Sequence, residues 1–212
     1  MWCLRWLLIA AVLQLLSACA SGFSNGLSSL LDEVRNPPSS ARQTPLKAGI
    51  RYLLVENNQR EALMVWVGNE VSPMGPTTIW VSADGVVLRL AQGRLVGISE
   101  PTRQWQLISE TKLVPPDNDP KAPYFSQTTD EQPGQRMGVI RHVSKTPVKA
   151  SAQTTAWQPQ GLHWEQELDV STGTRLALHG YHRPEGEIVA GQRCIHTRWC
   201  LRWQTWPAHS TP

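Results

Sequence analysis

Glu165 and Glu167 are the two side chains of this 212-residue sequence best spaced to act as a catalytic pair. Two residues apart on one face of a β-strand, their carboxyl groups would be separated by about 7 Å, within the roughly 5 to 9.5 Å that glycoside hydrolases use. Alternating acids are also the usual solvent-facing side of a half-exposed strand. We favour the solvated face and predict no catalytic residue. A carbohydrate-active enzyme that uses these carboxylates is the alternative.

Other signatures of enzymes, cofactors and metals are missing from the sequence. No G-x-S-x-G nucleophile elbow, phosphate loop or dinucleotide fingerprint occurs, and His179 and His182 lack a second pair of ligands at metal-site spacing. The formal net charge of +3 is spread over basic residues that alternate with acids, far below the charge of a DNA-binding domain. We therefore expect a protein that is not an enzyme, holds no cofactor or metal, and does not bind nucleic acid.

The segment 193–206 interleaves arginine with tryptophan and contains no acidic residue. Sugars stack on tryptophan faces and acidic polymers pair with arginine, so this segment is a candidate saccharide-contacting or partner-contacting surface. Strand alternation also places Trp199, Leu201 and Trp203 on one face, which is typical of a buried strand. We favour a core strand whose arginines face solvent, with polymer or partner contact as the alternative. The candidate contact residues are Arg193, Arg198, Trp199, Arg202, Trp203 and Trp206.

The N-terminal residues predict a lipid anchor. Arg5 precedes an apolar run over residues 7–16, which is too short to span about 30 Å of hydrocarbon and is typical of a signal peptide. Leu16-Ser17-Ala18-Cys19 follows and resembles the bacterial lipobox, so residues 1–18 are interpreted as a lipoprotein signal peptide and Cys19 as the lipidation site. Acyl chains such as palmitate would anchor the protein in a membrane. Ala20, rather than Asp, indicates the periplasmic face of the outer membrane. An ordinary signal peptide without a lipid is the alternative.

Two further cysteines, Cys194 and Cys200, would remain in the oxidising periplasm. In one straight strand they would lie about 20 Å apart, whereas a disulfide requires Cα atoms within about 7 Å. A bond therefore requires a tight reversal between them. We favour the disulfide over a continuous strand with two free thiols, because exposed periplasmic thiols tend to oxidise.

The elements that would position these residues are predicted to be mainly β. A hydrophobic content of 41% and ten tryptophans can form a core. Residues 19–48 have the composition of a tether with one short amphipathic helix, and residues 49–212 form a β domain. Short runs spaced by about ten residues indicate an antiparallel meander, barrel-like or sandwich. The Pro-rich segment 111–135 is interpreted as a loop that could join two sheets or subdomains.

Part of the sequence resembles a known family. The lipobox, then Tyr52-Leu53-Leu54-Val55, then the stretch from Trp80 to Leu88 (Trp-Val-Ser-Ala-Asp-Gly-Val-Val-Leu), and then Gly93-Arg94-Leu95-Val96 are similar to the YjbF/GfcB family of group 4 capsule polysaccharide lipoproteins. The similarity covers about residues 50 to 110. The loop 97–101 departs from the family pattern and is not carried over.

The resemblance implies a mainly β outer-membrane lipoprotein that acts as a non-enzymatic accessory in capsule or exopolysaccharide assembly or export. Its implied partners are the membrane, through the N-terminal lipid, and polysaccharide-export proteins or the polymer itself. A purely structural partner of an outer-membrane export barrel is a further alternative.

Overall fold

The computed structural model of the chain describes residues 41–57, 60–114, 123–149, 161–182, 186–196 and 199–207. The expected signal peptide, the lipidation site Cys19, most of the tether with its short helix, and Arg198 lie outside the described residues. Within them, no helix is long and apolar enough to cross a membrane. The one helical element that the structure describes is the short 3-10 turn η1 (Ala41–Gln43).

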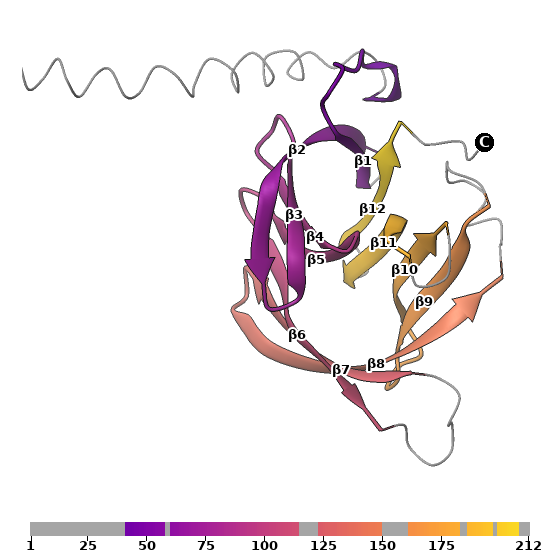
Figure 1. Cartoon of the computed structure of the whole chain (residues 1–212). Helices are drawn as coiled ribbons and strands as arrows, with labels where there is room; N and C mark the ends of the chain where they lie inside the picture. The colour runs from indigo at the N-terminus through magenta and orange to yellow at the C-terminus, as the bar shows by residue number, and fades with distance from the viewer. Residues whose placement is uncertain are drawn as a thin grey trace, which may run out of the picture. The chain divides into compact units, whose positions relative to one another are not determined.

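The domain is a closed barrel in which every strand pairs antiparallel with its neighbours in the sequence, and β1 pairs with β12 to close the sheet (Figure 1). The prediction of an antiparallel, mainly β fold is confirmed. Strands before and after the Pro-rich segment belong to the same sheet. The strands are β1 (Tyr52–Asn57), β2 (Arg60–Ser72), β3 (Gly75–Val81), β4 (Val87–Ala91), β5 (Arg94–Ser99), β6 (Gln104–Leu113), β7 (Tyr124–Gln132), β8 (Arg136–Val148), β9 (His163–Asp169), β10 (Arg175–Tyr181), β11 (Ile188–His196) and β12 (Trp199–Trp206).

Side-chain alternation divides β1 between two apolar clusters. Leu53 and Val55 belong to the main core cluster, which lies inside the barrel, mostly on β1 to β6 and β12. Tyr52 and Leu54 face the other way and pack beneath Ala41 in a smaller cluster on the outside. Burial of each large apolar side chain contributes roughly 1.5 to 3 kcal/mol, so both faces of β1 stabilise the fold.

The segment 111–135 is not the continuous loop that its prolines suggest. Strand β6 continues to Leu113 and β7 begins at Tyr124, so the two form a long hairpin in which Lys112 pairs with Phe125. All five prolines of the segment lie outside both strands. Proline tends to lie at strand ends because it has no N–H to donate to a neighbouring strand. The Ser, Thr and Gln residues between the prolines still form strand β7, because β6 and β8 pair with it on either side.

The turn between β4 and β5 crosses the barrel to reach β11. Ile188 N donates to the carbonyl of Gln92 at 3.1 Å, and Trp203 Nε1 donates to the carbonyl of Gly93 at 2.9 Å. A Cβ at Gly93, whose φ is +79°, would lie 1.9 Å from the Ile188 carbonyl oxygen. Only glycine permits this approach. The next residue, Arg94, is thereby carried into the barrel interior.

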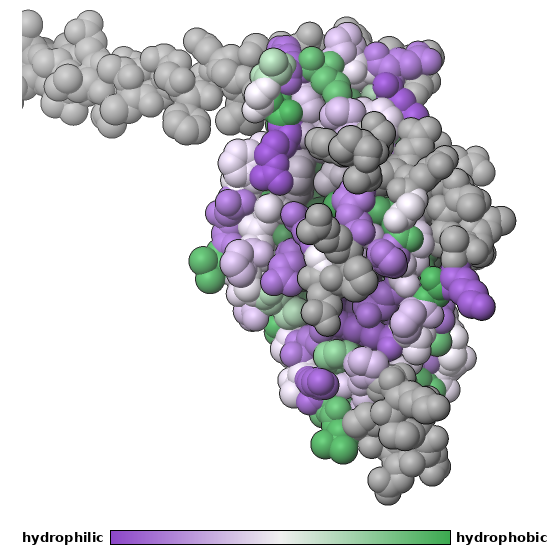
Figure 2. All heavy atoms as spheres, turned by 45° about the vertical axis from the view of Figure 1, so that its right-hand side comes forward, coloured by the Kyte–Doolittle hydropathy of each residue, from purple (hydrophilic) through white to green (hydrophobic). Residues whose placement is uncertain are grey.

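The outer surface is polar on the face that Figure 2 shows. Hydrophilic residues cover most of its described part, and hydrophobic residues are scattered among them. The described residues on this face thus present no broad apolar area, as expected of a surface in contact with water.

Candidate functional site

Glu167 lies inside the barrel, where its side chain has no exposed area. The prediction that the acidic face of β9 is solvated is wrong at this residue. Alternation places Trp164 on the opposite face, where it packs with Leu178 and Ala190 in a separate apolar cluster. Alternation identifies two faces of a strand but does not tell which one the sheet encloses, and closure of the barrel turned the acidic face inward.

Four side chains lie within 3.2 Å of the Glu167 carboxylate, and Lys145 Nζ lies 3.8 Å from its Oε1. Arg94 lies 2.7 Å from Oε1 and Arg193 lies 3.0 Å from Oε2. His179 Nε2 is 3.2 Å from Oε1, and the Gln127 amide donates to Oε2 at 3.2 Å. The carboxylate is therefore neutralised by two buried guanidinium groups and hydrogen-bonded on both oxygens.

A second carboxylate extends this network. Arg94 binds Glu110 through two parallel hydrogen bonds of 2.8 and 2.6 Å, a bidentate geometry that favours arginine over lysine. Lys145 and Gln127 donate to the same carboxylate at 2.9 Å each. We call the full set the interior charge cluster, and its members are Arg94, Glu110, Gln127, Lys145, Glu167, His179 and Arg193.

The electrostatics of the cluster keep its acids ionised. Burial alone would raise the pKa of Glu167, but the charge of Arg94, the His179 hydrogen bond and the charge of Arg193 outweigh it and hold the pKa well below the ordinary value. The pKa of Glu110 is lowered in the same way against burial, mainly by Arg94 and Lys145. Burial lowers the pKa of His179, and Glu167 offsets only part of that effect, so this imidazole is neutral at pH 7.

These properties bear on the proposed catalytic pair. Glu167 is ionised and enclosed, so it offers no proton and has no exposed atom to meet a substrate. Glu165 is half-buried and accepts a hydrogen bond from the Tyr181 hydroxyl at 3.3 Å, while burial and Glu165 raise the pKa of Tyr181. Catalysis by two carboxylates requires both to flank the scissile bond. The interior charge cluster therefore stabilises the barrel by linking its strands from the inside.

The candidate contact residues of segment 193–206 that the structure describes do not form one surface. Trp199 and Trp203 are buried in the main core at 1% exposure each. Arg193, which we expected to face solvent, is inside at 2% exposure and lies over the ring of Trp105 at 4.6 Å. Arg202 is partly exposed and pairs with Glu56 at 3.3 Å.

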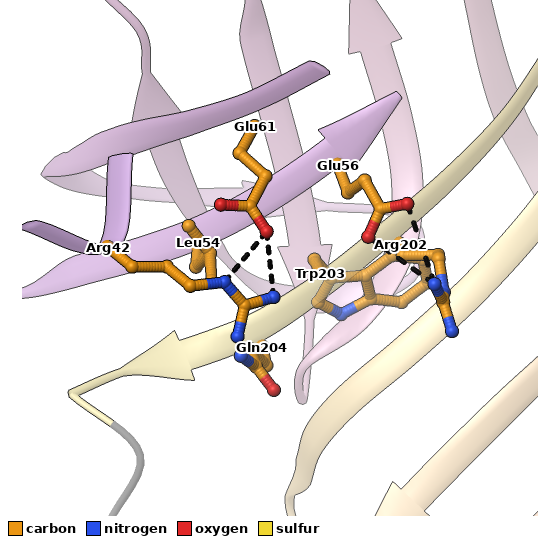
Figure 3. Close-up of a pocket in the computed structure, with 7 residues that line it drawn as sticks. All are labelled: Arg42, Leu54, Glu56, Glu61, Arg202, Trp203 and Gln204. Atoms are coloured by element: carbon orange, nitrogen blue, oxygen red, sulfur yellow. Dashed lines mark hydrogen bonds and ion pairs between the residues drawn. The ribbon is translucent and has the colours of Figure 1, made fainter. Parts of the chain in front are cut away.

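Arg202, Trp203 and Gln204 of this segment line a small pocket (Figure 3). Arg42 pairs with Glu61 at 2.7 Å and Arg202 pairs with Glu56, so two ion pairs cross the pocket. Its volume of about 20 Å³ is room for a single water molecule. One ion pair therefore joins the segment before β1 to β2 and the other joins β1 to β12, while the pocket is too small for an organic ligand.

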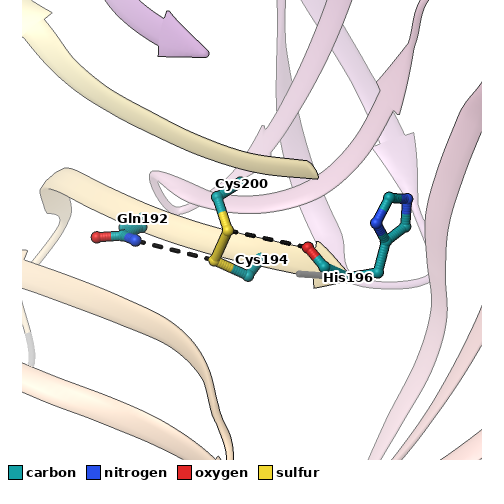
Figure 4. The surroundings of a disulfide bond; sticks show 4 residues. All are labelled: Gln192, Cys194, His196 and Cys200. Atoms are coloured by element: carbon teal, nitrogen blue, oxygen red, sulfur yellow. Dashed lines mark hydrogen bonds between the residues drawn. A yellow bond between two sulfur atoms is a disulfide. The ribbon is translucent and has the colours of Figure 1, made fainter. Parts of the chain in front are cut away.

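Cys194 and Cys200 are joined by a disulfide in the structure (Figure 4). They are cross-strand partners of β11 and β12, with a Cα–Cα distance of 4.0 Å and an S–S distance of 2.00 Å. The chain reverses between them as the hairpin turns, which is the geometry that the spacing required.

A further cavity lies at one mouth of the barrel. It has a volume of about 290 Å³. Because turns alternate between the two ends of an up-and-down barrel, the turns after β1, β3 and β5 lie at this end, and each of them lines the cavity together with Leu201 of β12. The lining residues are Val55, Asn57, Arg60, Ala62, Met64, Ser82, Asp84, Val86, Leu88, Glu100, Pro101, Arg103 and Leu201.

Sequence analysis missed this site. Its polar residues come from turns, such as the Asp84-Gly85 turn, whose sequence signal reports backbone conformation rather than binding. Trp199 links it to the candidate segment, because its Nε1 donates to Glu100 at 3.2 Å and Arg103 stacks over its ring at 4.3 Å. Among the residues that the structure describes, no group of three or more His, Cys, Asp or Glu side chains could hold a metal ion.

Comparisons with known proteins identify a solved structure with a similar fold. No family model matches the chain, and no curated protein matches its sequence. The crystal structure described as the hypothetical lipoprotein YmcC from Escherichia coli (K12) is similar, with a TM-score of 0.52 over 78% of this chain and 91% of that one. The sequence identity is 10%, so the similarity shows a shared fold.

Proposed function

We propose that this chain is an outer-membrane lipoprotein, anchored through Cys19, whose barrel acts in the periplasm as a non-enzymatic accessory in capsule or exopolysaccharide assembly or export. The lipobox and the fold shared with a protein described as a lipoprotein support the anchor. The resemblance of residues 50 to 110 to capsule lipoproteins supports the link to polysaccharide.

One observation carries the non-enzymatic part of the proposal. The barrel interior is occupied by the main apolar core and by the interior charge cluster, in which Glu167 is enclosed and paired with Arg94 and Arg193. A catalytic carboxylate must reach a substrate, and this one reaches only other side chains. An accessory that binds at its rim needs no open interior.

The test is the amount of surface polysaccharide in a deletion strain complemented with variants. We expect polymer to be lost on deletion, restored by the native gene, and not restored by Cys19→Ala. The matched control is Cys3→Ala, which removes a cysteine of the predicted signal peptide and should restore polymer. Radiolabelled palmitate should enter the native protein and the control but not Cys19→Ala.

Two results would overturn the proposal. Unchanged polysaccharide in the deletion strain, under conditions in which the polymer is made, would remove the role in assembly or export. Loss of polymer in Glu165→Gln, with the variant present at normal levels, would favour the carbohydrate-active enzyme, because Glu165 is half-buried and its neutralisation should leave the fold intact.

A further inference from the structure

The two ends of the barrel carry different residues. Strands alternate in direction around the sheet, so the start of β1, the β2–β3 turn and the ends of β6 and β8 lie at one end, which we call the hairpin end. The cavity of about 290 Å³ lies at the opposite end, which we call the cavity end. The exposed charged and aliphatic residues of the hairpin end include Leu46, Lys47, Arg51, Val71, Lys112, Val114, Lys149 and Glu187.

Two long hairpins carry exposed valines at the hairpin end. Strand β2 continues past its pairing with β1 as far as Ser72, beside β3 alone. Strand β6 likewise continues past its pairing with β5 as far as Leu113, beside β7 alone. Val71 near the first tip is 94% exposed, and Val114, directly after β6, is 89% exposed. Because apolar surface is costly to leave in water, both tips favour contact with an apolar partner.

The exposed charges at the hairpin end are mainly positive. Arg51, Lys112 and Lys149 are exposed and have no ion-pair partner among the described residues. Lys47 adds a fourth exposed cation. Glu187 is the one exposed acid at this end in the part of the chain that the structure describes. The hairpin end therefore presents a positive surface around its two valine tips.

The cavity end has a different balance of charge. Its acids Glu56 and Glu61 are each paired with an arginine. Its other described charged residues are the five acids Asp84, Glu100, Asp130, Glu131 and Asp169 and the four arginines Arg60, Arg103, Arg136 and Arg175. Met137 and Ile140 are exposed aliphatic side chains here as well, but they lie near Asp130 and Glu131 on the β7–β8 hairpin. An anionic surface would thus favour the hairpin end over the cavity end.

A bilayer that contains anionic phospholipid fits the hairpin end. Its phosphate groups attract lysine and arginine, and the acyl region beneath them accepts aliphatic side chains. Val71 and Val114 belong to different hairpins, so contact with both requires a partner that extends across the whole end of the barrel. A membrane surface has that extent and offers both chemistries together.

The predicted lipid anchor keeps such a surface within reach. The described part of the chain begins at Ala41, 22 residues after Cys19. A chain of that length spans at most about 75 Å, so an anchored barrel stays near the bilayer. Because tethering raises the effective concentration of the two surfaces, a weak contact is sufficient for docking.

We propose that the barrel docks on an anionic phospholipid bilayer through its hairpin end. Val71 and Val114 contact the lipid, while Arg51, Lys112 and Lys149 bind phosphate groups. The proposal rests on the proposed lipid anchor and adds an orientation to it. The cavity end then points away from the membrane, into the periplasm.

The test places a dye that senses apolar surroundings on single cysteines of the full-length acylated protein. The protein is reconstituted in vesicles of phosphatidylethanolamine and phosphatidylglycerol. Because Cys194 and Cys200 are bonded to each other, the introduced cysteine is the thiol that the dye labels. In Val71→Cys and Val114→Cys we expect emission at shorter wavelength and quenching by nitroxide-labelled lipid. Met137→Cys is the matched control, since this residue is 58% exposed at the cavity end and its dye should show neither change.

Charge variants of the dye-labelled protein measure the electrostatic part of the docking. Lys112→Gln and Lys149→Gln should each lower the ratio of docked to undocked barrel about 5-fold, the factor expected for one cation near an anionic surface. Arg60→Gln is the matched control, because it removes an exposed cation of the cavity end and should leave the ratio unchanged. Vesicles of phosphatidylcholine alone should weaken docking of the native barrel.

Several outcomes would overturn the docking. Equal responses of the three dyes, or a response from Met137→Cys alone, would contradict the orientation. Equal docking of Lys112→Gln and Arg60→Gln, or undiminished docking on phosphatidylcholine, would contradict recognition of anionic lipid. Silent dyes on a protein that carries palmitate would leave the proposed anchor standing, whereas a protein without palmitate would overturn the anchor itself.

Discussion

Replacing Glu167 with Gln tests whether the interior charge cluster holds the barrel together. The substitution keeps the size of the side chain and removes its charge. Arg94 and Arg193, 2.7 and 3.0 Å away, would then face an amide while remaining buried. Glu110 would be left as the one carboxylate that neutralises the cluster from within.

The expected loss follows from breaking a buried ion pair by removal of one partner, which costs about 3 to 5 kcal/mol. Domains of this size are stable by roughly 5 to 15 kcal/mol, so the variant should lose a large fraction of its stability. With a urea m value of about 2 kcal/mol/M, the unfolding midpoint should fall by roughly 1.5 to 2.5 M.

The assay is urea unfolding followed by tryptophan fluorescence at pH 7. The matched control is Glu165→Gln on the same strand, where one hydrogen bond of 3.3 Å from Tyr181 is affected and a loss below about 1 kcal/mol is expected. A loss below about 1 kcal/mol in Glu167→Gln as well would refute the reasoning, because the carboxylate would then not be paired inside the barrel.

The same variant should change the response to acid. The pKa of Glu167 is depressed in the folded state, so its contribution to stability is present above the unfolded pKa, about 4.3, and is lost as pH falls through the folded value. The native protein should therefore lose stability below about pH 4.3 more steeply than Glu167→Gln. Parallel curves would contradict the assigned pairing.

Three further perturbations have defined outcomes. Burial lowers the pKa of His179 in the folded state, so the unfolded chain takes up the proton first and stability should fall as the pH drops from 6.5 to 5.5, by at most about 1 kcal/mol from this residue. His179→Gln should flatten that change, and an unaltered slope would contradict it. Gly93→Ala and Gly85→Ala both place an alanine at positive φ, which costs about 1 to 2 kcal/mol of stability. Only the alanine at position 93 also clashes with the Ile188 carbonyl, so Gly93→Ala should lose about 1 to 3 kcal/mol more than Gly85→Ala. Equal urea midpoints for the two variants would refute the crossing turn. The paired change Cys194→Ser and Cys200→Ser should cost about 2 kcal/mol and abolish the sensitivity of the urea midpoint to reductant; a native protein with two titratable thiols would exclude the bond.

The antiparallel β fold could be read from local sequence. Short runs rich in β-branched and aromatic residues, separated by turns such as Asp84-Gly85, predict strands at a spacing that suits hairpins. Alternation also placed Trp199, Leu201 and Trp203 together on one face, and the structure buries all three. These features depend on neighbours in the sequence, so the sequence alone is sufficient for them.

The site could not be read in the same way. Its cavity forms where three turns lie beside strand β12, and the pairing of β1 with β12 brings Asn57 opposite Leu201, residues far apart in the chain. Nothing in the local pattern of either strand indicates that partner.

The sequence by itself determined the strands, the turns, the predicted lipid anchor and the two faces of each strand, because backbone preference and side-chain alternation act over a few residues. Only the tertiary structure decided which face became the interior. Closure of the sheet enclosed Glu167 and Arg193, which strand alternation had predicted to face solvent. The crossing turn at Gly93 places Arg94 beside Glu167. A buried charge is stable only beside its counter-charges, and those come from strands that meet after the whole barrel has formed.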